Sequence, residues 1–166
     1  SRSLYKGWES GVPAMSFAIS SAERIARARS DLRIGVPVVV VDGARTAVIL
    51  AAETASAERL AALVATGGGT ADLALTHRRA DTLRARSYDG DLARIVLPED
   101  AGLAWVRATA DPSLDLSQPL KGPFRSRRDG DPALHRAAIT LCKDARLLPA
   151  ALVAELRADG TGAGTD

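Results

Sequence analysis

The stretch VVVVDGARTAVILAAET, residues 38–54, decides the fold that this sequence predicts. Residues 38–41 are consecutive valines, a β-branched run that is typical of a strand buried on both faces. Asp42 and Gly43 form a strong turn dipeptide, and residues 46–52 are apolar enough to return beside the first strand. The stretch therefore predicts a β-hairpin.

Helical and extended patterns alternate around this hairpin. Ser20 and Glu23 have the spacing of a capping box, which predicts a helix over residues 21–34. Further helices are expected after Ser56 and Thr76, over residues 101–110 and from Pro132 onward, and further strands at residues 72–76, 92–97 and 152–157. This order predicts an α+β fold, a three-layer α-β-α domain with a mixed twisted sheet.

Residues 15–160 are expected to form one domain, after an extension or added residues at 1–14 and before a flexible tail at 161–166. The net charge of +2 gives no argument for nucleic acid, and no stretch approaches the roughly 20 apolar residues that span a bilayer. A single cysteine, Cys142, excludes a cysteine-based zinc cluster and fits an inert core thiol. We expect a cytoplasmic protein, of bacterial type from its richness in Ala and Arg, without membrane or nucleic-acid partners.

Several segments, taken in order, resemble 3,4-dihydroxy-2-butanone 4-phosphate synthase, the riboflavin-pathway enzyme. They are GVPVVVVD at 35–42 with ILAAETAS at 49–56, GGGTADLALTHRRADTL at 67–83, RATADP at 107–112, and HRAAITLCKDARLLPAALVAELRADGTG at 135–162. The resemblance implies a homodimer with that family's fold. It also implies a reaction that uses magnesium to convert ribulose 5-phosphate to dihydroxybutanone phosphate and formate.

The acidic residues that the family uses for this chemistry are missing at the matching positions. The family's acidic loop after the first strand is shortened here to residues 42–46, and Arg136 falls where the family has a metal-binding glutamate. Magnesium requires hard oxygen ligands, and a guanidinium reverses the charge where a cation should bind. The resemblance thus predicts the scaffold with a degenerate metal site, no metal and no cofactor.

Asp72 is the leading catalytic candidate, because a carboxylate in the apolar strand DLALT can be tuned by burial for acid/base work. Asp72 also falls at a position where the family has a pocket cysteine. The alternative is an aspartate that caps the turn of residues 67–69. Asp42, alternatively a plain turn residue, and His135, in the first turn of the last helix, complete the proposed catalytic set.

Basic and polar residues supply candidates for substrate binding. Guanidinium and ammonium groups bind carboxylates and phosphates, although charged runs are often only solvated surface. The candidates are Arg45, Thr46, Lys121, Arg125 and Arg136, and the charged run at residues 121–128 could act as an anion clamp.

Two classes of function follow from this pattern. The first is a repurposed biosynthetic enzyme, a lyase or isomerase in specialised metabolism. Such an enzyme would perform metal-independent dehydration, isomerisation or cyclisation of a small polar substrate. The second is a non-catalytic pseudoenzyme that binds a metabolite or a catalytic partner. An authentic synthase that releases formate is the third and least favoured interpretation.

Overall fold

The computed structural model describes residues 18–119 and 122–156. Lys121, residues 1–14 and the tail at 161–166 therefore lie outside the described residues. The elements are α2 (Ser21–Arg33), β1 (Val38–Asp42), β2 (Arg45–Ala51), α3 (Ala57–Thr66), β3 (Asp72–Thr76), α4 (His77–Thr82), β4 (Leu92–Val96), α5 (Leu103–Ala110), the 3-10 helix η2 (Pro112–Leu114), α6 (Ala133–Asp144) and β5 (Ala150–Leu156). The helices and strands expected from the sequence are confirmed.

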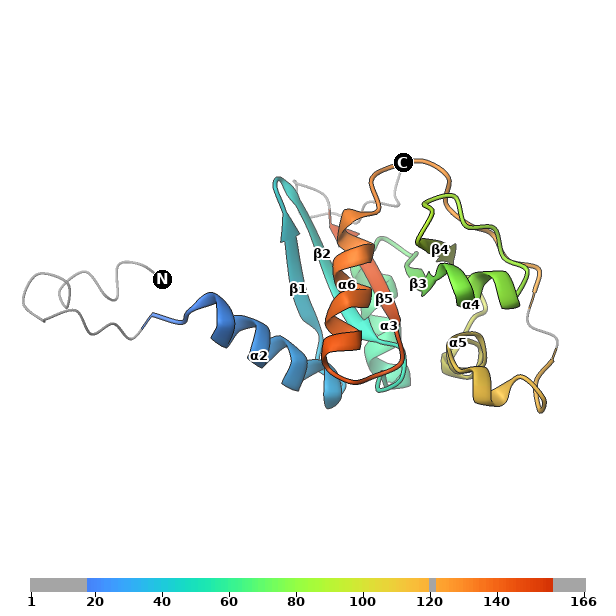
Figure 1. Cartoon of the computed structure of the whole chain (residues 1–166), viewed down its shortest axis with the longest axis horizontal. Coiled ribbons are helices and arrows are strands. Elements are labelled where there is room, and N and C mark those ends of the chain that lie inside the picture. The colour runs from blue at the N-terminus through green and yellow to red at the C-terminus, as the bar shows by residue number, and fades with distance from the viewer. Residues whose placement is uncertain (1–17, 120–121, 157–166) are drawn as a thin grey trace, which may run out of the picture.

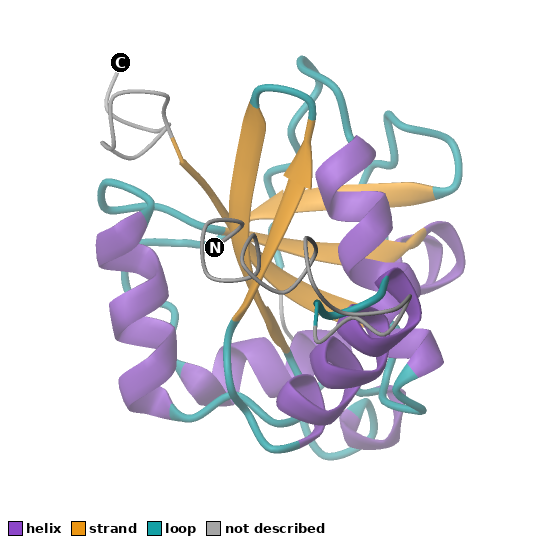
Figure 2. Ribbon diagram, turned by 90° about the vertical axis from the view of Figure 1, so that its left-hand side faces the viewer, coloured by secondary structure: helices purple, strands orange, loops and turns teal. Residues whose placement is uncertain are grey.

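Two layers of helices cover a five-stranded sheet in the order β1-β2-β5-β3-β4 (Figures 1 and 2). Apolar side chains of α3, α4 and α5 pack on one face, and those of α2 and α6 pack on the other. This confirms the three-layer α+β architecture. The expectation of a mixed sheet was wrong, because all four strand pairings are antiparallel.

Strand β1 is less buried than its valine run predicted. Val39 and Val41 are 61% and 65% exposed, because the core formed by α3, α4 and α5 does not extend to β1 at the sheet edge and leaves this face of the strand uncovered. Val38 and Val40, on the opposite face of the strand, pack against the core beneath α6. The prediction of a strand buried on both faces is therefore corrected to an edge strand buried on one.

The hairpin turn places Arg45 at the start of β2. Asp42 pairs with Arg45, so the loop consists of Gly43 and Ala44. Gly43 has a φ of 60°, the left-handed conformation that glycine adopts without a steric penalty. Arg45 therefore emerges where β2 begins to pair with the end of β5.

The segment at residues 125–127 runs beside β4. Arg125 O accepts from Val96 N at 2.8 Å, and Arg127 N donates to Arg94 O at 2.8 Å, on either side of an isolated bridge between Ile95 and Ser126. Backbone hydrogen bonds thus fix this segment along the outer edge of β4. No helix among the described residues is long and apolar enough to cross a membrane.

Candidate functional site

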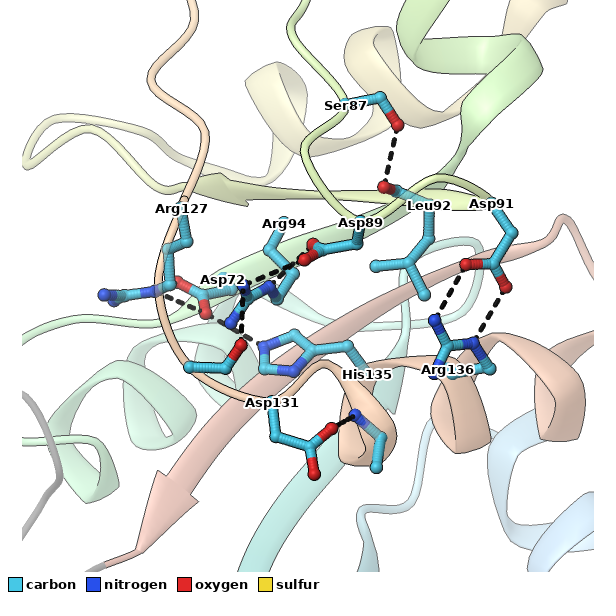
Figure 3. A network of polar contacts seen from close by, with 12 residues as sticks. Asp72, Ser87, Asp89, Asp91, Leu92, Arg94, Arg127, Asp131, His135 and Arg136 are labelled. Atoms are coloured by element: carbon cyan, nitrogen blue, oxygen red, sulfur yellow. Dashed lines mark hydrogen bonds and ion pairs between the residues drawn. The ribbon is translucent and has the colours of Figure 1, made fainter.

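Asp72, the first residue of β3, lies buried between two neighbouring strands. It pairs with Val96 of β4 on one side and Val153 of β5 on the other. Its Oδ2 lies 2.9 Å from Nε2 of His135, as Figure 3 shows. The two leading catalytic candidates, 63 residues apart in sequence, therefore meet as a carboxylate–imidazole pair.

His135 is held in this position by the start of α6. The Oδ1 atom of Asp131 accepts a hydrogen bond of 2.9 Å from Ala133 N at the helix N-terminus, and the imidazole ring of His135 is buried. Because carboxylate oxygens accept hydrogen bonds, this contact fits a His135 ring that carries a hydrogen on Nε2. Nδ1 is buried and has no hydrogen-bond partner in the described part of the chain. The hydrogen bond of the ring to Asp72 is therefore made through Nε2.

Arg127 closes the other side of the carboxylate. Its Nε lies 2.7 Å from both oxygens of Asp72, and its side chain is 36% exposed. The backbone pairing of residues 125–127 with β4 brings this guanidinium over the end of β3. Asp72 is thus bound by one buried partner, His135, and one partner that solvent can reach.

A cavity of about 350 Å³ opens beside this pair. It is lined by Arg45, Gly67, Thr70, Ala71, Asp72, Arg94, Arg127, Asp129, Gly130, Asp131, His135, Val153, Ala154 and Glu155. A volume of this size fits a small metabolite. The lining is strongly charged, with three arginines facing four carboxylates.

Two of these arginines are anchored by bidentate ion pairs. Arg45 donates to the two carboxylate oxygens of Glu155 at 2.7 and 3.3 Å, and this hydrogen bonding to Glu155 is the main cause of the raised pKa of Arg45. Arg94 donates to the two oxygens of Asp89 at 2.9 and 3.1 Å and reaches Gly130 O at 3.4 Å. These pairs fix the positions of the cavity walls, and Figure 3 shows the pair of Arg94 and Asp89.

The structure brings together three of the residues predicted for the site, Asp72, His135 and Arg45. Asp42 is exposed at the hairpin and does not line the cavity, and neither does Thr46, which pairs with Leu156. Arg125 lines a different cavity.

Arg136 lies on the surface, away from the cavity. It donates to both oxygens of Asp91 at 2.8 Å, and this contact lowers the pKa of Asp91 and raises that of Arg136. Lys121, the remaining candidate, lies outside the described residues.

Sequence reasoning missed Arg94, Asp131 and Glu155, and it left Arg127 as one member of a charged run. A signal for Arg94 was present, since it is the lone charge in the apolar strand LARIV, as Asp72 is in DLALT. The sequence holds no comparable signal for Arg127, because it does not specify which of several loop arginines reaches the sheet.

The carboxylates of the cavity do not form a magnesium site. Magnesium is bound through carboxylate oxygens that are free to face the ion. Both oxygens of Asp72 contact Arg127, and both oxygens of Glu155 contact Arg45. Within residues 18–119 and 122–156, no group of three or more His, Cys, Asp or Glu side chains is placed to hold a metal ion.

The fold and the cavity define the class: a three-layer α+β domain with a buried carboxylate–imidazole pair at one end of its sheet. No protein-family model and no curated protein sequence matches the chain. The chain does match solved structures. A 3,4-dihydroxy-2-butanone 4-phosphate synthase of Candida albicans aligns at a TM-score of 0.59 and 21% identity, over 83% of each chain.

A two-domain synthase from A. baumannii aligns at a TM-score of 0.59 and 16% identity, over 84% of this chain, which spans half (50%) of that protein. A synthase solved in complex with two magnesium ions aligns at 0.55 and 21% identity, over 79% of this chain and 74% of the other. The chain therefore has the fold of the dihydroxybutanone phosphate synthases.

Proposed function

We propose that this protein is a repurposed enzyme on the synthase scaffold, which performs metal-independent acid/base chemistry on a small polar substrate. The observation that carries the proposal is the 2.9 Å contact between Asp72 and His135 beside a cavity of about 350 Å³. A buried carboxylate held by an imidazole is a suitable proton acceptor, since water does not compete for it.

The partly exposed guanidinium of Arg127 gives the substrate access to Asp72. An anionic substrate group, a carboxylate or phosphate, can take over the Arg127 guanidinium by a bidentate contact. This exchange frees Oδ1 of Asp72 to accept a proton from the carbon next to a substrate carbonyl, while His135 keeps its hydrogen bond to Oδ2. The electron pair of the broken C–H bond moves onto the carbonyl oxygen as an enolate.

Return of the proton determines the reaction type. Where the deprotonated carbon carries a hydroxyl, the hydroxyl hydrogen passes to the enolate oxygen, a carbonyl forms at that carbon, and Asp72 returns its proton to the former carbonyl carbon, which completes an isomerisation. Where the next carbon carries a hydroxyl, the enolate re-forms its carbonyl and a C=C bond, and the hydroxyl leaves with the proton from Asp72 as water, which completes a dehydration. Both reactions conserve the atoms of substrate and product without an oxidant. A lyase performs the dehydration and an isomerase performs the isomerisation. We therefore propose one of these two roles in a biosynthetic pathway, with specialised metabolism as the favoured setting.

The exposed Val39 and Val41 on edge strand β1 support assembly as a homodimer through that edge, which light scattering on the purified protein would test.

The ion pairs of the cavity support a second candidate, a metabolite-binding protein without catalysis. Arg45, Arg94 and Arg127 each contact a carboxylate of the protein. A cavity whose charges are already paired can serve as a rigid binding site, and such a protein needs no proton acceptor. The two candidates differ in whether a substrate C–H bond exchanges its hydrogen.

Hydrogen exchange measured by proton NMR in D2O tests the proposal. The protein is incubated with a panel of keto-sugar phosphates and 2-keto acids, with and without magnesium, and ribulose 5-phosphate is included to monitor formate. We expect loss of a C–H signal without formate. In Asp72→Asn the exchange rate should fall about a hundredfold or more, the usual contribution of a general base.

Asp91→Asn is the matched control, because it changes the same residue type in an Arg–Asp pair on the surface. It should exchange at the rate of the unmodified protein, and circular dichroism establishes that both variants are folded. Exchange that survives Asp72→Asn would refute the acid/base role. Binding of a panel compound without any exchange would favour the non-catalytic candidate, and stoichiometric formate would identify a synthase.

A further inference from the structure

A second cavity, of about 950 Å³, lies between the end of α4 and the segment at residues 122–128. Its lining comprises Thr82, Leu83, Arg84, Arg86, Tyr88, Asp115, Pro119, Gly122, Pro123, Phe124, Arg125, Ser126 and Arg128. None of these residues lines the Asp72 cavity. The extended segment separates the two, with Arg127 directed to Asp72 and its neighbours Ser126 and Arg128 lining the second cavity.

This second cavity carries positive charge that the described residues do not neutralise. Its four arginines are exposed: Arg84, Arg86, Arg125 and Arg128. No carboxylate in the described ranges forms an ion pair with any of the four. The one acid in the lining, Asp115, accepts two hydrogen bonds from Arg79, at 2.7 and 2.8 Å. In the Asp72 cavity, by contrast, each arginine has a carboxylate partner.

Aromatic rings lie among these arginines. The guanidinium of Arg128 stacks over the Tyr88 ring, 4.9 Å from its centroid, and the Tyr88 side chain is exposed. Phe124 is supported from behind by Trp105, with ring centroids 6.0 Å apart. The cavity therefore combines exposed guanidinium groups with flat aromatic surfaces.

We propose that this cavity is a binding site for an organic polyphosphate of the nucleoside di- or triphosphate class. Guanidinium groups match phosphate oxygens in bidentate geometry, so four unpaired arginines suit two or three phosphates. The exposed ring of Tyr88 can stack on a nucleobase. The volume lies within the range of small-molecule sites. The net charge of +2 is low for a protein that holds a nucleic-acid strand, so a small ligand is favoured.

The backbone at Arg84 provides a matched control. Arg84 has a φ of 60° just after α4, where its N donates to Asp81 O and the next residue, Ala85, donates to Ala80 O. Arg146 has a φ of 62° in the same motif after α6. Glycine is the favoured residue at such a position because it has no Cβ to clash. Arg84→Gly and Arg146→Gly should therefore stabilise the fold similarly, while only the first removes a guanidinium from the cavity.

Isothermal titration calorimetry with ATP and with inorganic tripolyphosphate tests the site. We expect ATP to bind and Arg84→Gly to weaken ATP binding about tenfold. Arg146→Gly should leave ATP binding unchanged, although it should raise the melting temperature by the same amount as Arg84→Gly does. Tyr88→Ala should weaken ATP binding by a larger factor than tripolyphosphate binding, because both ligands lose the stacked support of Arg128 but only the nucleotide has a base to stack.

Equal binding of ATP to the unmodified protein and to the double variant Arg84→Gly/Arg128→Ala would overturn the assignment, as would no heat with either ligand at millimolar concentration. Tripolyphosphate binding without ATP binding would overturn the nucleotide class. A short single-stranded RNA that binds more tightly than ATP would overturn it in favour of nucleic acid. The test does not depend on the Asp72 chemistry.

Discussion

The buried ion pair between Arg94 and Asp89 should be the most sensitive electrostatic contact of the Asp72 cavity. The side chains of Arg94 and Asp89 are 3% and 6% exposed. Asp89→Asn removes the charge and one acceptor, and the guanidinium keeps its proton because arginine does not titrate in proteins. Its remaining contacts among the described residues are the amide oxygen left at position 89 and the carbonyl of Gly130, at 3.4 Å. A buried charge left without a counter-charge costs about 3 to 5 kcal/mol of unfolding free energy.

Asp91→Asn makes the same chemical change in a pair of equal geometry. Arg136 donates to both oxygens of Asp91 at 2.8 Å, but the two side chains are 46% and 57% exposed. Water replaces the lost contact there, so the expected cost is about 0.5 kcal/mol or less. Burial alone should therefore separate two substitutions that look equivalent in the sequence.

Urea unfolding at pH 7, followed by far-ultraviolet circular dichroism, measures both changes on one scale. A domain of this size has an unfolding free energy of about 5 to 15 kcal/mol, so Asp89→Asn should lower the urea midpoint markedly, with a similar slope. Unfolding free energies of the two variants that agree within about 1 kcal/mol would refute the reasoning. The Gly130 backbone would then need another support than the Arg94 side chain.

Two further substitutions follow from packing. Gly67→Ala should prevent folding or cost more than about 3 kcal/mol, because the new Cβ would lie 2.1 Å from the carbonyl oxygen of Thr70. Gly102→Ala, with nothing within 4 Å of its Cβ, should change the urea midpoint little, and similar midpoints for the two would contradict this packing. Burial raises the pKa of the Cys142 thiol from 9.0 to about 12, so a thiol reagent at pH 8 should react only after denaturant is added. The protonated thiol stabilises the fold below about pH 9 and loses that effect as the pH rises toward 12; stability should therefore fall in this window relative to Cys142→Ala, and an unchanged difference would exclude the shift.

The sequence predicted the elements well because their signals are local. The capping box at Ser20 and Glu23 forms as expected, and the valine run does become a strand. The burial of that strand could not be predicted, since it depends on which helices reach the edge of the sheet, and at β1 only the face beneath α2 and α6 is packed. A run of valines carries no information about which of its faces a helix covers.

The site was predictable residue by residue but not as a constellation. Asp72 stood out because a charge in an apolar strand needs a reason, and His135 because it opens a helix near the expected pocket. Their hydrogen bond depends on where α6 crosses the sheet. The choice of Arg127 as the second partner depends on backbone pairing of a loop with β4. Contacts between residues so far apart in sequence leave no local pattern.

The place of β5 has a consequence for how the chain folds during synthesis. The last strand of the described residues, at 150–156, lies in the middle of the sheet and joins the β1–β2 hairpin to the β3–β4 pair. Until this strand leaves the ribosome, the two halves have no shared strand, and each exposes an unpaired edge. The sheet therefore closes only after residue 156 has emerged, which favours slow assembly and makes chaperone protection of the nascent chain valuable.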